Sequence, residues 1–309
     1  MNSTSLHVVI GAGPLGRAVA EQALGDGNQV RMVTRSGKGG VSGADSIAAD
    51  IMDAGAARAA CEGADVVYQC AAPAYQNWPK AFPTLQENVL QGAARAGAVL
   101  VAAENLYAYG VAGRLHEGLP LAATTRKGST RAALSRRLFE AYTGGELRTV
   151  SPAARDFFGP GVRVSAIGER LWPALLKGKP VDWFGNPDLP HSLTYVPDFA
   201  RALVRLGAEE RAWGRAWHVL SPEPLTPRQV IARMAALAGL PEPKVRQTPA
   251  LMLRLVGLFV PAAGEIIEMG YSYNEPFVMD DSAYREAFGG TSTDWETALT
   301  ATLAFWRSQ

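Results

Sequence analysis

The 309-residue chain has few cysteines, little net charge and no long apolar run. Its two cysteines, Cys61 and Cys70, lack a C-x-x-C spacing and indicate no disulfide framework. Thirty basic and 29 acidic side chains give a formal charge of +1, so no global field favours nucleic acid or an acidic membrane. The most apolar later stretch, residues 251–263, is too short to span a bilayer. No basic stretch leads into a long apolar one at the N-terminus. We therefore expect a cytoplasmic protein with neither nucleic-acid nor membrane partners.

The strongest pattern lies near the N-terminus, where an apolar run stops at a glycine-rich turn. Residues 8–10 lead into Gly11-Ala12-Gly13-Pro14-Leu15-Gly16, and a helical stretch follows. Gly11 permits a tight turn, Gly13 lets backbone approach a pyrophosphate, and Gly16 allows close packing of helix on strand. The N–H groups and the positive end of a helix attract anions. The pattern predicts a dinucleotide site that includes Gly11, Gly13, Pro14, Leu15 and Gly16.

The first half of the chain alternates strands with helices. Strands are expected at residues 7–10, 29–33, 65–70, 99–103 and 148–152, with a short one ending at 49–51, and helices at 14–24, 54–61 and 82–96. Such alternation is typical of βαβ units. It predicts an α/β fold with a Rossmann-type, doubly wound parallel sheet.

The second half is less regular and richer in proline and tryptophan. Helices are expected at residues 167–176, 198–206 with Asp198 as N-cap, 226–238, 249–258 and 295–306, and strands at 192–197 and 217–220. We expect a smaller, mostly helical C-terminal substrate-binding lid. The predicted division is residues 1–158 with about 192–222 for the Rossmann domain, interleaved with about 159–191 and 223–309 for the substrate-binding part.

The end of the second predicted strand indicates which dinucleotide is bound. It reads Thr34-Arg35-Ser36 and lacks the carboxylate that commonly binds the adenosine ribose of NAD. The arginine fork suits the oxygens of a 2′-phosphate. These residues favour NADP(H) and leave NAD(H) open, the alternative being a solvated arginine at a strand end.

Further cofactor contacts are expected after the third and fourth strands. Asp50 suits the exocyclic amine of adenine and Ile51 its ring, although Asp50 in a helix cap is the alternative. Ligands of open parallel sheets lie at the carboxyl edge. The residues expected there are Cys70, Ala71, Ala72 and Pro73 for the cofactor and Tyr75 for the substrate.

Several motifs recur in an order that resembles a known family. They are the glycine turn, Asp50-Ile51, residues 65–72, Asn88, Tyr109-Gly110, residues 158–161 and Tyr195-Val196-Pro197-Asp198. Together they resemble an extended or atypical short-chain dehydrogenase/reductase of the NAD-dependent epimerase/dehydratase family, over nearly the whole chain. The resemblance is specific for fold and cofactor, and much less so for the reaction. It implies that Asn88 organises the backbone of the fourth strand and that Tyr109 packs beneath a loop.

The chain departs from that family at the catalytic pair. Family members use Tyr-x-x-x-Lys, yet none of the nine tyrosines here has lysine four residues later. Aligning the glycine and alanine of that motif places Lys127 at the tyrosine and Arg131 at the lysine. Counting back from Tyr109-Gly110 places Asn105 at the usual serine.

These replacements still permit hydride chemistry. Lys127 would donate the proton, helped by the nearby charge of Arg131, which would hold the ribose hydroxyls, while Asn105 would donate to a carbonyl oxygen. Tyr107 is a competing proton donor. A basic, solvated helix face that holds cofactor without turnover is the alternative, as is binding of a substrate carboxylate or phosphate by the two cations.

The resemblance adds Phe158 and His191 as candidate substrate residues, although a lone histidine is more often structural. The four histidines and the carboxylates show no metal-ligand spacing.

We expect NADPH-dependent reduction of a carbonyl-like small molecule. A nucleotide-sugar epimerase or dehydratase with bound NAD is one alternative, and a catalytically silent NADP(H)-sensing regulator is another. Related folds often dimerise through two helices, so a homodimer is compatible with the resemblance.

Overall fold

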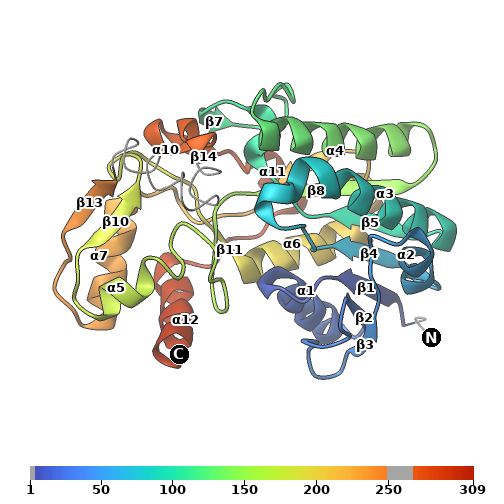
Figure 1. The fold of residues 1–309 in the computed structure, drawn as a ribbon, viewed down its shortest axis with the longest axis horizontal. Helices are drawn as coiled ribbons and strands as arrows, with labels where there is room; N and C mark the ends of the chain where they lie inside the picture. Colours follow the sequence, from blue (N-terminus) through green and yellow to red (C-terminus); the bar gives the residue numbers. More distant parts are fainter. Residues whose placement is uncertain (1–3, 249–266) are drawn as a thin grey trace. The chain divides into compact units, whose positions relative to one another are not determined.

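The computed structural model describes residues 4–248 and 267–309 (Figure 1). The chain forms two compact units, each built from three stretches. The first unit comprises Met1–Tyr109, Leu121–Ala153 and Phe199–Val219. The second comprises Gly110–Pro120, Ala154–Asp198 and Leu220–Gln309. The helix expected at 249–258 lies outside the described residues.

The first unit is built on an eight-stranded sheet in the described part of the chain. Its strands are β1 (Leu6–Ile10), β2 (Gln29–Thr34), β3 (Asp45–Ala48), β4 (Val66–Gln69), β5 (Val99–Ala102), β6 (Glu104–Asn105), β8 (Arg148–Ala154) and β12 (Ala216–His218). The order is β12-β8-β5-β4-β1-β2-β3, every neighbouring pair along it is parallel, and β6 pairs with β8. Because the order reverses between β1 and β4, the sheet is doubly wound, and open sheets of this kind generally bind ligands at such a reversal. The predicted Rossmann-type fold is confirmed.

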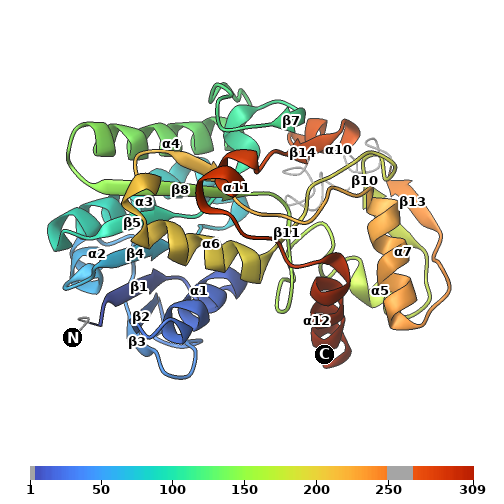
Figure 2. The same cartoon turned by 180° about the vertical axis from the view of Figure 1, so that it is seen from behind.

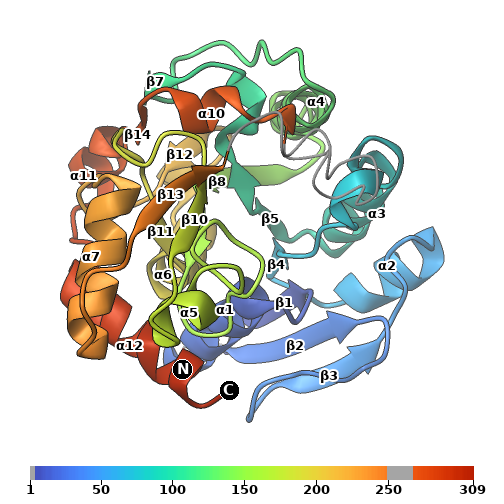
Figure 3. The ribbon, with the colours of Figure 1, turned by 60° about the vertical axis from the view of Figure 1, so that its left-hand side comes forward.

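Helices cover both faces of this sheet. They are α1 (Pro14–Gly25), α2 (Ala54–Cys61), α3 (Trp78–Ala96), α4 (Arg126–Thr143) and α6 (Val196–Ala208). Side chains of α2, α3 and α4 share one core with Val67 and Leu100 of the strands. On the other face, a Cβ added to Gly207 of α6 would lie 3.0 Å from Val101. Figure 3 shows α1 and α6 on one side and α2, α3 and α4 on the other.

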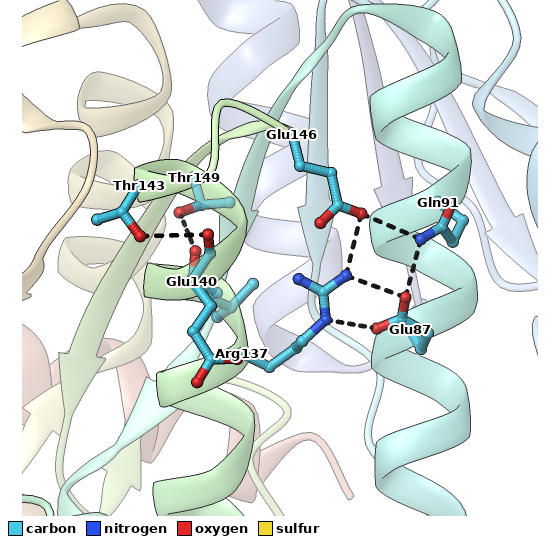
Figure 4. Close-up of polar contacts among 8 residues, drawn as sticks. Glu87, Gln91, Arg137, Glu140, Thr143, Glu146 and Thr149 are labelled. Carbon is cyan, nitrogen blue, oxygen red and sulfur yellow. Dashed lines mark hydrogen bonds and ion pairs between the residues drawn. The ribbon is translucent and has the colours of Figure 1, made fainter.

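A polar network ties α3 to α4 (Figure 4). Arg137 of α4 donates from Nε to Glu87 Oε2 (2.9 Å) and from Nη2 to Glu146 Oε1 (3.0 Å). Gln91 of α3 donates to both of these glutamates. Partial burial opposes ionisation of Glu87, but the hydrogen bonds from Arg137 and Gln91 hold its pKa below the usual value. The network steadies the helix that carries Lys127 and Arg131.

The second unit contains helices and short strand pairs. Its strands are β7 (Gly113–Leu115), β9 (Phe157–Phe158), β10 (Val181–Phe184), β11 (Thr194–Tyr195), β13 (Val245–Thr248) and β14 (Phe277–Met279). Its helices are α5 (Trp172–Leu176), α7 (Pro227–Ala238), α10 (Tyr271–Asn274), α11 (Ser282–Phe288) and α12 (Trp295–Arg307). The strands pair as β10-β13, β11-β9 and β14-β7. Thr226 and Gln229 form a capping box that starts α7.

Two expectations about the second half are wrong. Of the helix expected at 167–176, only residues 172–176 are helical. Helix α6 is labelled in Figure 2, in front of the sheet. Asp198 is not its N-cap, because the helix already begins at Val196 and its Pro197 suits a first helical turn. The carboxylate of Asp198 instead accepts hydrogen bonds from the N–H and hydroxyl of Thr293.

Candidate functional site

The glycine turn between β1 and α1 has the geometry of a phosphate cradle. Gly11 has φ +104°, and a Cβ on Gly16 would lie 2.0 Å from the Gly11 carbonyl oxygen, so helix and turn touch. A Cβ on Gly13 would meet nothing within 4 Å. Gly13 caps α1 without a side-chain hydrogen bond, and the first turn holds no acid. Within the described residues, the helix therefore places no acidic side chain of its own first turn beside its positive end.

The loop after β2 is tied to the same helix. Arg17 of α1 donates to the carbonyl oxygens of Gly39 (2.7 Å) and Gly40 (3.0 Å). Thr34 donates to the Lys38 carbonyl oxygen, and the side chains of Arg35 and Ser36 are exposed. Sequence reasoning missed Arg17, whose position one residue after Gly16 was its signal. The ordered loop leaves Arg35 open to a ligand.

Asp50 and Ile51 lie in a turn that follows β3. Asp50 Oδ1 accepts from the Met52 N–H (3.0 Å), and Ile51 packs into the core of the first unit. Asn88 of α3 donates to the carbonyl oxygens of Ile51 (2.9 Å) and Met52 (3.0 Å). Asn88 therefore has a structural role, but the backbone that it holds is that of the turn at Ile51 and Met52. The expectation that it holds the backbone of the fourth strand is wrong.

The segment after β4 passes close to the glycine turn. A Cβ on Gly11 would lie 3.0 Å from the Ala71 nitrogen, and Cys70 donates its N–H to the Ile10 carbonyl oxygen. The Trp78 indole donates to the Pro73 carbonyl oxygen (3.1 Å) and its ring packs edge-on against Tyr75. The residues expected here, Cys70, Ala71, Ala72, Pro73 and Tyr75, thus follow the strand at the carboxyl edge.

Helix α4 starts against the segment that follows β6. Thr125 caps the helix by accepting from the Gly128 N–H (3.1 Å). A Cβ on Gly128 would lie 2.8 Å from the Tyr107 carbonyl oxygen, so only glycine permits this approach. Lys127, which lies between Thr125 and Gly128 in the sequence, is 1% exposed. Its Nζ lies 4.2 Å from the centroid of the Tyr75 ring. The basic, solvated helix face considered from the sequence is therefore wrong for Lys127, which is buried.

Asn105 is held by its own turn. Its Oδ1 accepts from the Tyr107 N–H (3.1 Å). The ring of Tyr107 packs at 6.2 Å from that of Trp78. Tyr109 is buried and hydrogen-bonds His218 (2.8 Å), as expected for a packing residue.

Arg131 lies one turn after Lys127 and forms a buried ion pair. Its Nη1 donates to Glu104 Oε2 at 3.1 Å. Burial raises the pKa of Glu104, while the charge and hydrogen bond of Arg131 and a hydrogen bond from the Asn105 N–H act in the opposite direction. Sequence reasoning missed Glu104, which directly precedes Asn105.

Two predicted substrate residues belong to the second unit. Phe158 is buried in that unit's core, stacked on Trp295 at 17° and 5.3 Å. Its side chain therefore packs in this core, and its contact with the substrate stays a prediction. His191 is also buried, and its Nε2 lies 2.6 Å from Asp156 Oδ2. It is not a lone histidine.

Asp156 is the centre of a charged cluster in the second unit. Arg155 Nε lies 3.2 Å from the Oδ2 that His191 contacts, and the Tyr273 hydroxyl donates to Oδ1. Burial opposes ionisation, but Arg155 and His191 hold the pKa of Asp156 below its usual value. Burial lowers the pKa of His191. Asp156 has φ +36°, and no other non-glycine residue in the described ranges has a positive φ.

Residues 4–248 and 267–309 contain neither a metal-binding cluster nor a helix that could span a membrane. No group of three or more His, Cys, Asp and Glu side chains there is arranged to hold a metal ion. None of the helices in those ranges has the length and apolar character needed to cross a membrane.

The sequence of the chain matches a known protein family. Residues 7–220 match the NAD dependent epimerase/dehydratase family. A search of curated proteins finds no match to the chain.

Solved structures share the fold across the whole chain. A nucleoside-diphosphate-sugar epimerase from Pseudomonas aeruginosa is 18% identical, with a TM-score of 0.76, over 99% of this chain and 98% of that chain. The dTDP-glucose 4,6-dehydratase from Bacillus anthracis, in complex with NAD, is 14% identical, with a TM-score of 0.78 over 99% and 97%. The UDP-N-acetylglucosamine 4-epimerase from Bacillus cereus is 16% identical, with a TM-score of 0.77 over 99% and 98%.

Proposed function

Because the chain belongs to the NAD-dependent epimerase/dehydratase family, we propose that it reduces a carbonyl-like small molecule with NADPH, using Lys127 in place of the family's tyrosine. The observation that carries the proposal is the burial of Lys127 at the start of α4, against the segment that holds Asn105 and Tyr107. Lysine side chains are almost never fully buried unless they are paired, so the burial of this one is unusual.

The first unit fits a dinucleotide. The open space above Gly13 and the uncapped start of α1 suit a pyrophosphate, and a side chain at Gly13 would fill that space. Exposed Arg35, with Ser36 beside it, suits a 2′-phosphate. The bound nicotinamide would supply the hydride.

The residues of this chain would supply the rest of the chemistry. The Asn105 amide nitrogen would donate to the substrate oxygen, and the Lys127 ammonium would transfer a proton to that oxygen as hydride arrives at carbon. The Tyr75 ring holds the ammonium in place. Arg131 would orient the ribose through the N–H groups that Glu104 does not engage.

Replacing Lys127 by methionine should lower the single-turnover rate of NADPH oxidation by about 100-fold or more, because general acid catalysis typically contributes about 10²–10⁴. NADPH affinity should stay within about 3-fold, since no cofactor contact is assigned to the ammonium. The exposed Lys80→Met change on α3 is the matched control. Stopped-flow fluorescence against a panel of aldehydes and ketones measures both quantities. An unchanged rate would leave Tyr107 or a water as the proton donor.

Replacing Arg35 by alanine should weaken NADPH binding about 10- to 100-fold and leave NADH binding nearly unchanged, because a charge-assisted bond contributes about 1.5–3 kcal/mol. Fluorescence titration with each cofactor measures the two affinities. Arg58→Ala, an exposed arginine on α2, is the control and should change neither. Equal losses for the two cofactors would remove Arg35 from the phosphate site.

A second function is favoured by the neighbours themselves. Solved structures of the same fold include nucleotide-sugar epimerases and dehydratases, one of them in complex with NAD. Mass spectrometry of ligands retained by the purified protein distinguishes the two. Retained NAD, with no NADPH oxidation by any carbonyl compound, would favour the epimerase or dehydratase. Bound NADPH that no carbonyl compound oxidises would favour a regulator that senses the cofactor without turnover.

A further inference from the structure

The buried ion pair between Glu104 and Arg131 is held unusually firmly. Glu104 is 4% exposed and Arg131 is 6% exposed. The guanidinium carbon of Arg131 lies 4.6 Å from the centroid of the Trp78 ring and 4.4 Å from that of Phe82. Both rings belong to the core of the first unit. The pair is therefore positioned by packing as well as by charge.

This pair leaves two buried polar atoms without partners. Within the described residues, neither Glu104 Oε1 nor Arg131 Nε has a hydrogen-bond partner. A buried acceptor without a hydrogen-bond partner destabilises the folded state, and more so when it is charged. Native proteins therefore satisfy nearly all such atoms. The free oxygen of Glu104 points to a donor that arrives with a ligand.

The place of Glu104 in the sheet indicates which part of a dinucleotide it meets. The glycine turn follows β1, Arg35 and Asp50 follow β2 and β3, and Glu104 follows β5 on the opposite side of β1 (Figure 3). Neighbouring strands lie about 4.8 Å apart, so β5 is about 10 Å from β1. With the pyrophosphate at β1 and adenosine towards β2 and β3, the second ribose lies towards β4 and β5.

The chemistry of the free oxygen selects the ligand group. An ionised carboxylate only accepts hydrogen bonds. Its charge is already balanced by Arg131, so a second cation is not required. A neutral hydroxyl supplies a donor without adding a buried charge.

We propose that Glu104 is a cofactor-binding residue whose Oε1 accepts a hydrogen bond from a hydroxyl of the nicotinamide-side ribose, with Arg131 holding the carboxylate in place. The proposal rests on the proposed function only for the identity of the cofactor. It adds a carboxylate to a site otherwise described by its cations. It also explains why Arg131, which is expected to hold the ribose hydroxyls, forms an ion pair with Glu104.

The test compares NADPH with two analogues, each lacking one hydroxyl of the nicotinamide-side ribose, by fluorescence titration. NADH and its analogues replace them if the wild-type protein prefers NADH. The wild-type protein should bind one analogue about 10- to 100-fold more weakly than the full cofactor, the value of a hydrogen bond to a charged group. Glu104→Gln should lose most of that discrimination. Glu140→Gln, at an exposed position of α4, is the control and should retain it.

A double variant tests the proposal in the case that Glu104→Gln does not fold. If Glu104→Gln leaves Arg131 uncompensated and the protein unfolds, Glu104→Leu/Arg131→Met replaces the whole pair with apolar groups, which proteins tolerate. It should bind the full cofactor and both analogues within about 3-fold of one another, because neither partner remains to read a hydroxyl. The Glu104 assignment is overturned if the wild-type protein binds both analogues like the full cofactor, with water at Oε1. It is equally overturned if Glu104→Gln discriminates like the wild type. The titrations contain no carbonyl substrate. They therefore test the Glu104 assignment even if the protein binds the cofactor without reducing any carbonyl compound.

Discussion

Replacing Gly13 by alanine should weaken NADPH binding by about 100-fold or more and leave the folded protein almost unchanged. A Cβ at Gly13 meets no protein atom within 4 Å, and φ −69° suits alanine. The cost to stability is that of alanine at a helix N-cap, about 1 kcal/mol. The added methyl instead fills the space where the pyrophosphate must approach the backbone N–H groups, which removes charge-assisted bonds of about 1.5–3 kcal/mol each. Fluorescence titration and urea unfolding measure the two effects.

Alanine substitutions at two glycines within α1 serve as comparisons for Gly13→Ala. Gly16→Ala should lose both binding and stability, because its Cβ would lie 2.0 Å from a backbone oxygen that cannot move aside alone. Overpacking of this kind costs about 1–3 kcal/mol. Gly25→Ala, at the far end of the helix, has open space and should lose neither. If Gly13→Ala binds NADPH as tightly as Gly25→Ala does, the turn does not hold the pyrophosphate.

Replacing Asp156 by asparagine should lower the free energy of unfolding by about 3–5 kcal/mol, the cost of removing one charged partner of a buried ion pair. The change keeps the size of the side chain, and asparagine tolerates the left-handed φ of +36° at least as well as aspartate. What is lost is the charge that faces Arg155 and His191. Urea unfolding followed by tryptophan fluorescence reports on the second unit, which holds Trp172 and Trp183.

The matched control is Asp188→Asn, because Asp188 pairs with Arg228 at 2.6 Å on the surface of the same unit. Exposed pairs contribute little, so its midpoint should match the wild type. Acid supplies a second test. The pKa of Asp156 is depressed in the folded state, so its contribution is full above the unfolded value of about 3.9 and is lost as pH falls through the folded value. Equal midpoints for the two variants would show that the cluster does not stabilise the unit.

The first unit was predictable because its strands and helices are local patterns. Helix α2 spans Ala54–Cys61, as expected from the alanine-rich run after Asp53, whose carboxylate accepts from the Ala56 N–H. The buried strands β4 and β5 are short apolar runs bounded by breaks. A parallel sheet covered on both faces requires such runs.

The second unit was harder because long-range contacts decide its local structure. Strands β10 and β13 pair across 64 residues, from Asp182 to Arg246, and neither was expected. The helix expected from residue 167 starts only at Trp172, since a Cβ on Gly168 would lie 2.1 Å from the Arg163 carbonyl oxygen in a tight turn. Nothing in the local pattern of either segment encodes these partners.

In the candidate site, too, some residues could be predicted from local sequence patterns and others could not. Positions such as Lys127, Asn105 and Arg131 follow from motif spacing along the chain. Their partners do not, because Glu104 meets Arg131 across 27 residues and Asp156 meets His191 across 35. A buried acid has no sequence signature until the cation that holds it has been placed.

The interleaving of the two units has a consequence for biosynthesis. The first unit takes its last stretch from Phe199–Val219, which supplies most of α6 and the edge strand β12. A growing chain therefore cannot complete the sheet of the first unit until residues 154–198 of the other unit have left the ribosome. A fragment ending near residue 153 would expose the face around Val66 and Val101 that Gly207 covers. Expression of the first unit alone thus requires a chain that extends to Val219.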